Sequence, residues 1–409
     1  MGGPGTAARL SGRVAAPFAP ATPGGPGGAL HSLRSLLRSH RPQQAIHTRA
    51  NRATLYAHGG DFFPALFAAM EAAATAIRAE FYIVRADATG DRFARALMDA
   101  AGRGVDVALI YDTVGCFDTP ASYFRRLEAA GVRCLAFNPP TFRRLHWLDV
   151  RNHRKVAVID GRTAFLGGIN VGDEYAGFGE SLTRWRDVGA RLDGPAAAEL
   201  DAIFRKTWAR ETGDELAPCT ALPADDGDAE VTLINGTPRQ TRSAILRSFS
   251  LTMTDARHSI RIVTPYFVPG PRILRALLRA VQNGVQVQLM LPSVSDLPLV
   301  QVASRAWLRP LLQAGVEVYQ RQGTILHAKV MLIDEAWATI GSANLDQRSF
   351  HRNYELNAVI DSHVFGAQVQ RMFTDDLDRS RQLVLDEYER AGWLVRLLAW
   401  LLTPLGRFL

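Results

Sequence analysis

Short runs of apolar residues alternate along the chain with segments in which apolar residues recur every three or four positions. The runs Val156–Ile159 and Val330–Ile333 predict buried strands, and the spacing within Phe93–Ala101 and Arg272–Gln282 predicts amphipathic helices. Strands that alternate with helices indicate an α/β fold with a largely parallel or mixed sheet.

This order of elements occurs twice, as strand, helix, strand, helix and then an apolar hairpin. Residues 76–82 and 104–107 match residues 259–266 and 284–287, and 409 residues suffice for two domains of ordinary size. The segment between the repeats is rich in Asp, Glu, Pro, Ala and Gly, which is typical of a linker. The expected units are a disordered basic arm (1–50), a first half (51–210), a linker (211–230), a second half (231–385) and an amphipathic tail (386–409).

The most specific pattern lies in the hairpin of each half. The chain has three lysines against 44 arginines, and two of the lysines follow a histidine by two positions. The pattern H-x-K-x4-D followed by G-[GS]-x-N occurs within residues 148–175 and again within 322–349, and one chance match is expected roughly 0.005 times. Its residues are His153, Lys155, Asp160 and Asn170 in the first copy, and His327, Lys329, Asp334 and Asn344 in the second.

On a strand, residues two positions apart share a face, so each histidine and its lysine are expected to point the same way. Asp160 and Asp334 lie an odd number of residues away and are expected to face elsewhere. We therefore interpret both aspartates as supports of the hairpin turn rather than as reacting groups.

This set of residues suits phosphoryl transfer. A neutral imidazole can attack phosphorus, an imidazolium can protonate a leaving alkoxide, and two histidines in one site can exchange these roles. Lysine ammonium and asparagine amide groups suit phosphate oxygens. Such a histidine also needs a carboxylate on its other nitrogen, and Asp187 and Glu355 are the candidates. The remaining histidines are interpreted as structural or surface residues: His31, His40, His47, His58, His146, His258, His351 and His363.

These motifs resemble the phospholipase D superfamily, whose HKD motif is the pattern above. Residues 167–175, 185–187 and 341–349 resemble bacterial cardiolipin synthases, and the resemblance spans about Thr54 to Val384. It implies two α/β/α sandwich halves related by a pseudo-twofold axis, with one active site at their interface. It also implies that His153 or His327 is the phosphohistidine nucleophile, that the other is the general acid and base, and that no metal or other cofactor is needed.

The chain departs from this family pattern in two respects. It lacks the pair of amino-terminal membrane helices that many such synthases carry, and position 154 of the first motif is Arg. We expect Arg154 to face away from His153 and to matter little.

Composition limits the possible binding partners, cysteine chemistry and targeting segments of the chain. The net charge of +7 suits anionic lipid headgroups and nucleic acid equally. Three widely spaced cysteines indicate neither a disulfide framework nor a metal site. The acid-free first 60 residues predict a flexible basic arm rather than a transit peptide. In the tail, Trp393 and Trp400 beside Arg396 are typical of an interfacial anchor, although a helix docked on the domain itself is the alternative.

The leading hypothesis is a peripheral membrane enzyme, placed on the cytoplasmic face of the inner membrane, that joins two phosphatidylglycerol molecules into cardiolipin and releases glycerol. Its partners are anionic phospholipids and the membrane surface. One alternative is a phospholipase D that uses water and makes phosphatidic acid. A nuclease is disfavoured because aromatic and basic residues are not interleaved as nucleic-acid binding requires, and an inactive adaptor is disfavoured because both motifs are intact.

Overall fold

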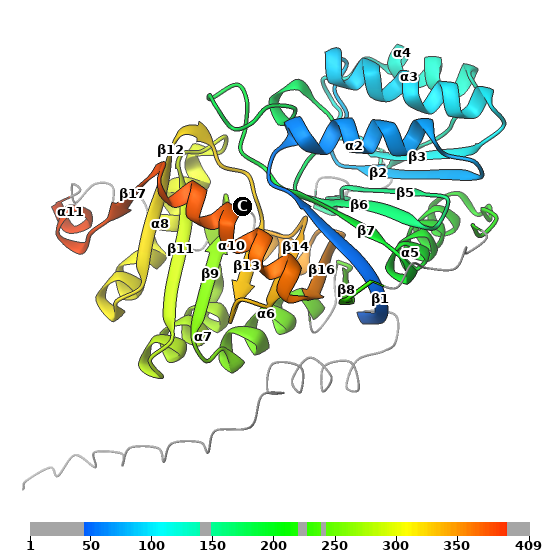
Figure 1. Ribbon diagram of the computed structural model, residues 1–409. Coiled ribbons are helices and arrows are strands. Elements are labelled where there is room, and N and C mark those ends of the chain that lie inside the picture. The colour runs from blue at the N-terminus through cyan, green and yellow to red at the C-terminus, as the bar shows by residue number, and fades with distance from the viewer. Residues whose placement is uncertain (1–44, 140–148, 220–226, 239–242, 391–409) are drawn as a thin grey trace, which may run out of the picture.

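The computed structural model describes residues 45–139, 149–219, 227–238 and 243–390. A single 15-stranded sheet runs through these residues, with helices on both of its faces (Figure 1). The first half of the chain forms one end of this sheet and the second half forms the other. The two-half α/β architecture expected from the repeat is therefore confirmed.

The first half contains seven strands, four helices and one short 3-10 turn within its described residues. These are β1 (Ala45–Tyr56), α2 (Gly59–Glu71), β2 (Ala76–Phe81), α3 (Ala88–Gly102), β3 (Asp106–Asp112), α4 (Ala121–Ala129), β4 (Arg133–Phe137), β5 (Val156–Ile159), β6 (Thr163–Gly167), η1 (Asp173–Tyr175), β7 (Gly189–Asp193) and α5 (Pro195–Thr212).

The second half repeats this order and adds short elements at its edge. Its elements are β8 (Ala229–Gly236), α6 (Ala244–Asp255), β9 (Ser259–Val263), β10 (Phe267–Val268), α7 (Gly270–Gln282), β11 (Gln286–Val294), α8 (Pro298–Ala314), β12 (Glu317–Ile325), β13 (Val330–Ile333), β14 (Trp337–Gly341), β15 (Leu345–Asp346), α9 (Gln347–His351), β16 (Glu355–Asp361), α10 (His363–Leu377), β17 (Ser380–Leu383) and α11 (Leu385–Arg390).

The strand order shows the pseudo-twofold relation directly. From the centre outward, the first half reads β1-β7-β6-β5-β2-β3-β4 and the second half reads β8-β16-β14-β13-β9-β11-β12-β17. The halves join where β1 and β8 pair antiparallel, with Ala45 opposite Ile234 and Thr48 opposite Val231. Because β1 begins at Ala45, residues 45–50 of the expected disordered arm are strand. Residues 1–44 and 391–409 of the expected arm and tail lie outside the described residues.

The local pattern explains these elements. The predicted strands Val156–Ile159 and Val330–Ile333 occur with those bounds as β5 and β13, and every residue in them is buried. Helices α3 and α7 contain the two predicted helical segments, and the Asp87 side chain caps α3 by accepting from the Gly90 N–H. One buried cluster draws side chains from both halves, including Val158, Ala338 and Phe365, so the halves share a core.

Both motif aspartates sit at the hairpin turns, in the left-handed conformation, with φ of 53° at Asp160 and 48° at Asp334. The Asp160 carboxylate accepts the N–H groups of Ala74, Thr75 and Ala76. The Asp334 carboxylate accepts those of Arg257, His258 and Ser259 in the same way.

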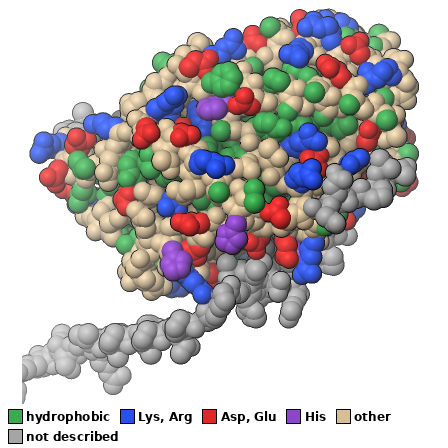
Figure 2. All heavy atoms as spheres, in the orientation of Figure 1, with side chains coloured by type: hydrophobic (Ala, Val, Ile, Leu, Met, Phe, Trp, Pro, Cys, Tyr) green, Lys and Arg blue, Asp and Glu red, His purple; other side chains and the backbone are tan. Residues whose placement is uncertain are grey.

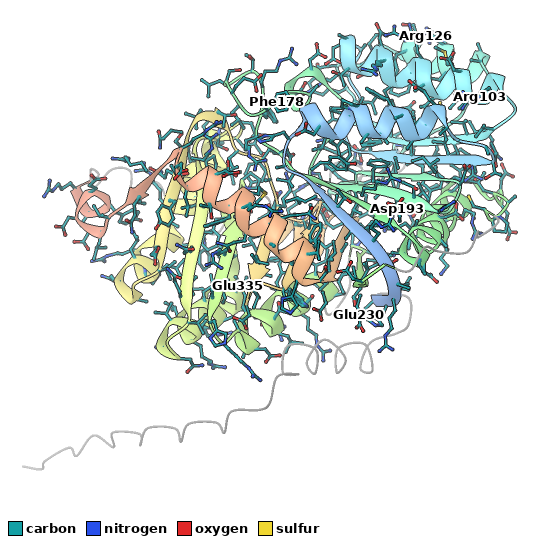
Figure 3. The ribbon with its side chains drawn as sticks, viewed as in Figure 1. Arg103, Arg126, Phe178, Asp193, Glu230 and Glu335 are labelled. Carbon is teal, nitrogen blue, oxygen red and sulfur yellow. The ribbon has the colours of Figure 1, made fainter. Side chains whose placement is uncertain are left out.

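Each aspartate thus ties its hairpin to the loop that leads into β2 or β9. Figure 3 places Glu335, the residue after Asp334, low on the molecule and Phe178 near its upper edge. This geometry supports the interpretation of both aspartates as structural.

Two further properties bear on function. No helix within the described ranges combines the length and the apolar character needed to cross a membrane. Figure 2 shows basic and acidic side chains interspersed over one face, so the net charge of +7 is not gathered into a single basic field there.

Replacing Asp160 with Ala should lower the free energy of unfolding by about 2 kcal/mol, because three backbone N–H groups lose their acceptor and Ala is disfavoured at positive φ. Asp160→Asn should cost less, since Asn tolerates this conformation and keeps one carbonyl oxygen. Urea unfolding measures both, with Glu71→Ala on the exposed end of α2 as the control. Equal stability of Asp160→Ala and the wild type would show that the turn does not depend on this carboxylate.

Candidate active site

The two motif histidines lie in one cavity, although they are 174 residues apart in the sequence. His153 precedes β5, and His327 precedes β13. Both line a cavity of about 280 Å³ between the halves, together with Asn170 and Asn344. The other lining residues are Tyr82, Ile83, Arg85, Arg151, Tyr175, Trp185, Tyr266, Asp296, Leu297, Val300, Asp346, Arg348 and Asn353.

The backbone around each histidine is held by the opposite half. The His153 N–H donates to the Tyr354 carbonyl over 2.9 Å, and the Tyr354 N–H donates to the Arg151 carbonyl over 2.8 Å. The second histidine has the matching pair: the His327 N–H donates to the Arg186 carbonyl over 2.8 Å, and the Arg186 N–H donates to the Ile325 carbonyl over 2.9 Å. Each pair is a small parallel bridge across the interface.

The acidic partners of the histidines are exchanged in the same way. Both carboxylate oxygens of Glu355 lie 3.1 Å from Nδ1 of His153, and Oδ2 of Asp187 lies 2.6 Å from Nδ1 of His327. The sequence analysis predicted both acids, but not that each one serves the histidine of the other half. Because a carboxylate can only accept, we assign the Nδ1 proton of each ring to this contact. The other ring nitrogen, Nε2, then carries the lone pair that can act as a base or nucleophile, and on His327 it lies 3.1 Å from Nζ of Lys329.

The motif lysines are buried beside the histidines. Lys155 Nζ donates to the His153 carbonyl over 2.6 Å and lies 5.1 Å from the centre of the Tyr82 ring. Lys329 Nζ donates to the His327 carbonyl and lies 2.7 Å from Nδ1 of the same ring. Each ammonium group is thus held next to its histidine, although neither lysine is among the residues that line the cavity.

Burial controls the protonation of this cluster. It lowers the pKa of His153 to about 4, against the opposing charge of Glu355 and with the help of Lys155. Burial and then Lys329 lower the pKa of His327. Burial also lowers the pKa of Lys329 to about 8, although Asp187 opposes it. Both imidazoles are therefore neutral at pH 7 in the free protein, and a bound phosphate anion would raise all of these pKa values.

The two motif asparagines differ in their free hydrogen-bonding capacity. Asn170 Oδ1 accepts from the Ile83 N–H over 3.1 Å, and its Nδ2 donates to the Tyr175 hydroxyl over 3.0 Å. The buried Oδ1 of Asn344 has no hydrogen-bond partner among the described residues. Asn344 is thus the better placed of the two to receive a ligand, and Asn170 helps to shape the cavity wall.

Comparison with known proteins agrees with this geometry. The family model described as "Cardiolipin synthase, PLD-like domain" matches residues 66–208 and 251–377, which contain both motifs. The chain belongs to the cardiolipin synthase family. The cardiolipin synthase of Geobacillus kaustophilus is 36% identical over 364 residues, covering 87% of this chain and 72% of that protein. Cardiolipin synthase 2 of Bacillus anthracis is 35% identical over 371 residues with the same coverage.

Solved structures show the same fold at lower identity. The phosphatidylserine synthase of Haemophilus influenzae Rd KW20 matches with a TM-score of 0.67 and 13% identity, covering 92% of this chain and 97% of that one. The polyphosphate kinase of Porphyromonas gingivalis matches with a TM-score of 0.50 and 13% identity, covering 80% of this chain and 50% of that one.

The structure explains why the second position of the G-[GS]-x-N pattern is glycine in the first half and serine in the second. A Cβ on Gly168 would lie 2.2 Å from Oδ1 of Asp187, so only glycine admits this carboxylate. At the equivalent position, Ser342 Oγ donates to Oε2 of Glu355 over 2.5 Å, and Asn353 Nδ2 donates to Oε1 over 3.2 Å. In both halves this position fits the acid that orients a histidine.

Several cavity residues were not singled out from the sequence. Tyr82 and Tyr266 occupy matching positions in the repeat, which was the available signal for them. Asp346 stands where the first motif has Gly172, and burial raises its pKa to about 6. Asp296 accepts from the Tyr266 hydroxyl over 2.5 Å. The cavity is therefore asymmetric, with both of these acids contributed by the second half.

Arg154 faces away from His153, as expected. The expectation that Arg154 matters little was wrong, because its side chain makes contacts that hold the two halves together. Its guanidinium is buried and donates to Glu80 over 3.3 Å and to Thr207 over 3.0 Å in the first half. It also donates to Asn235 of the second half over 2.5 Å. Arg154 thus joins the two halves behind the histidine, which residue spacing alone does not reveal.

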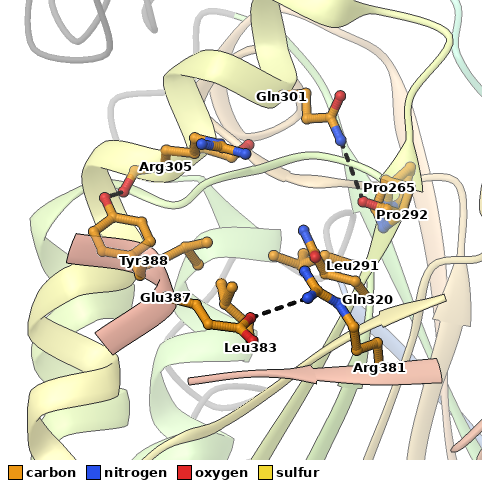
Figure 4. Close-up of a pocket in the computed structure, with 12 residues that line it drawn as sticks. Pro265, Leu291, Pro292, Gln301, Arg305, Gln320, Arg381, Leu383, Glu387 and Tyr388 are labelled. Carbon is orange, nitrogen blue, oxygen red and sulfur yellow. Dashed lines mark hydrogen bonds and ion pairs between the residues drawn. The ribbon is translucent and has the colours of Figure 1, made fainter. Parts of the chain in front are cut away.

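Two other features bear on further binding sites. Among the described residues, no group of three or more His, Cys, Asp or Glu side chains is arranged to hold a metal ion. A separate pocket lies between α8, β11, β12, β17 and α11 (Figure 4). Its walls include the ion pair of Arg381 and Glu387, 3.0 Å apart, and contain no motif residue.

The low pKa of His153 should make stability fall with acidity. Between pH 6.5 and about 4, the unfolded histidine binds a proton that the folded one does not, so the free energy of unfolding should decrease as pH falls through this window. We expect this residue to contribute on the order of 1–3 kcal/mol. Urea unfolding of the wild type and of His153→Gln at pH 7, 6 and 5 isolates the contribution. Parallel pH dependences would contradict a buried, neutral His153.

Proposed function

We propose that this enzyme of the cardiolipin synthase family transfers a phosphatidyl group from one phosphatidylglycerol to another, giving cardiolipin and glycerol. The observation that carries the proposal is the pair of histidines in one cavity, each oriented by a carboxylate from the other half. Family membership gives it independent support.

In the first step, Nε2 of one histidine attacks the phosphorus of the donor lipid. The bond from phosphorus to the glycerol headgroup oxygen breaks, and the second histidine, as imidazolium, protonates that oxygen so that glycerol leaves. The negative phosphodiester favours this charged form, because it offsets the burial that keeps both rings neutral in the free protein. The product of this step is a phosphatidyl-histidine.

In the second step, the second histidine is neutral and accepts the proton of the primary hydroxyl of another phosphatidylglycerol. The hydroxyl oxygen attacks phosphorus, the bond to the first histidine breaks, and cardiolipin is released. Two histidines thus exchange acid and base roles without net consumption of protons.

Lys155 and Lys329 bind the non-bridging oxygens of the phosphate, where negative charge gathers. The free amide oxygen of Asn344 can only accept, so it suits a hydroxyl of the headgroup, and Asn170 shapes the cavity wall. Burial lowers the pKa of both lysines, and a bound phosphate anion favours their charged form. Asp187 and Glu355 orient the rings. Asp160 and Asp334 support the hairpins from the far end of the strands and act at a distance from the reaction.

The protein acts on phospholipids at a membrane surface in this proposal, as a peripheral protein on the cytoplasmic face of the inner membrane. The cavity lies between the halves with Arg85, Arg151 and Arg348 in its wall, and these arginines suit an anionic headgroup. The tail predicted as an interfacial anchor lies mostly outside the described residues and stays a prediction. Hydrolysis to phosphatidic acid is the competing outcome.

Each of His153→Ala and His327→Ala should reduce turnover of phosphatidylglycerol by about 100-fold or more, because each removes a different bond-making or proton-transfer role. The matched control is His363→Ala, which removes an exposed histidine at the start of α10. Thermal unfolding establishes that each variant is folded. A folded variant that keeps more than a tenth of wild-type turnover would rule out one site built from both halves.

Labelled phosphatidylglycerol vesicles should yield cardiolipin and free glycerol, with phosphatidic acid as a minor product. Water is present at tens of molar, so transfer dominates only if the site excludes water and positions an alcohol. Excess glycerol should suppress the net yield by reversing the reaction. Thin-layer chromatography separates the products, and phosphatidic acid in excess at every lipid density would identify a hydrolase instead.

A further inference from the structure

Exposed apolar side chains gather around the mouth of the active-site cavity. In the part of the chain that the structure describes, eight large hydrophobic residues are exposed, and six of them lie on three segments that border the cavity. We refer to these six as the apolar rim. They are Phe117, after β3; Phe178 and Leu182, between η1 and β7; and Val294, Leu297 and Leu299, at the end of β11 and the start of α8.

The segment between β11 and α8 forms one side of the mouth. Leu297 itself lines the cavity, and so does Val300, so Leu299 lies between two lining residues. Val294 pairs with Ile325 of β12, two residues before His327. This side of the rim therefore begins within a few residues of a catalytic histidine.

The loop after β3 forms the other side. Phe117 follows Cys116, whose thiol donates to the Tyr82 carbonyl over 3.5 Å. It precedes Asp118, which pairs with Arg85 over 3.2 Å. Tyr82 and Arg85 both line the cavity, so the residues on either side of Phe117 in the sequence contact the cavity wall. Phe117 itself is 78% exposed, more than any other large apolar residue described.

The third segment comes from the loop before β7. The Leu182 carbonyl accepts from Nε1 of Trp185 over 3.1 Å, and the Trp185 ring lies 5.6 Å from the ring of His327. Phe178 belongs to the same loop, and Figure 3 shows it at the upper edge of the molecule.

The two remaining exposed residues lie away from the cavity. Val364 lies two residues after Ser362, whose N–H donates to the Ala336 carbonyl at the turn of the β13–β14 hairpin, the opposite end of β13 from His327. Val384 follows Leu383, which pairs with Val318 near the start of β12. The rim is therefore a local feature of the cavity mouth rather than an even scatter of apolar residues.

We propose that the apolar rim is the membrane-docking surface of the protein, and that it seats the cavity mouth on an anionic phospholipid bilayer. This inference rests on the proposed function, because the cavity then receives a headgroup whose acyl chains stay in the bilayer. Moving large exposed apolar side chains from water into lipid is favourable. Because these side chains surround the mouth, their insertion leaves the cavity open.

The cavity behind the rim favours a bilayer over a second copy of the chain as the occupant, because in the proposed function it has to receive a phospholipid headgroup whose acyl chains stay in the bilayer. Arg85, Arg151 and Arg348 line this cavity, and Arg85 is paired with Asp118 and Arg151 with Asp112, so charge does not decide between the two occupants. A copy seated on the rim would also cover the cavity. Exchange of substrate and product with the lipid phase requires an open cavity.

The test uses the full chain and vesicles of phosphatidylglycerol mixed with phosphatidylcholine. Phe117→Ser and Leu299→Ser should each weaken vesicle binding about 5- to 10-fold, and the double variant about 50-fold, as expected for removal of apolar area that enters lipid. Val364→Ser is the matched control, because Val364 is 60% exposed and Leu299 is 62% exposed. This control should stay within about twofold of the wild type. Leu299→Trp should bind at least as tightly, since Trp favours the interface.

Activity separates this inference from the proposed function. The double variant should lose at least tenfold in turnover of vesicle phosphatidylglycerol, yet turn over monomeric short-chain phosphatidylglycerol within about twofold of the wild type. If the wild type makes no product from either substrate, the proposed function fails while vesicle binding still tests the rim. Unchanged vesicle binding by the double variant would reject the rim as the membrane-docking surface. If sedimentation shows that the double variant changes from dimer to monomer while its lipid binding stays intact, the rim is instead an interface between two copies of the chain.

Discussion

The active site depends on an exchange of contacts between two halves of one chain. Each histidine takes its backbone bridge and its orienting carboxylate from the opposite half: Tyr354 and Glu355 for His153, and Arg186 and Asp187 for His327. The buried Arg154 adds a third link of the same kind. Because both ends of each link lie on rigid strands or their ends, the distance between the two rings is set by the sheet and not by flexible loops.

This arrangement places unusual electrostatic demands on the fold. Two histidines, two lysines and two carboxylates surround one cavity; all except the partly buried His153 are buried, and burial disfavours each charged form. Replacing such a cluster by apolar residues would be expected to stabilise a protein of this kind. The proposed function accounts for the cluster, because a single phosphate anion entering the cavity would stabilise the charged forms of both lysines and of one imidazole.

Much of the fold was predictable because it is encoded locally. The strands 156–159 and 330–333 appeared with their predicted bounds, and the turn role of Asp160 followed from its spacing alone. The meeting of the motif histidines and asparagines in one cavity was predictable from the repeated motif. The crossed pairing of acids and histidines was not, because it depends on how the two halves meet through β1 and β8, which no local pattern specifies. Asp296 and Asp346 were missed because the prediction relied on residues repeated in both halves, and neither aspartate has a counterpart in the first half.

The crossed links also constrain how the protein is made. His153 and Glu355 are 202 residues apart, and His327 and Asp187 are 140 residues apart. During synthesis, the first half emerges with the edge of β1 unpaired until β8 follows, and an open edge invites pairing with other chains. Neither histidine has its full set of partners until nearly the whole chain has left the ribosome. A nascent or truncated chain would therefore lack a complete catalytic centre.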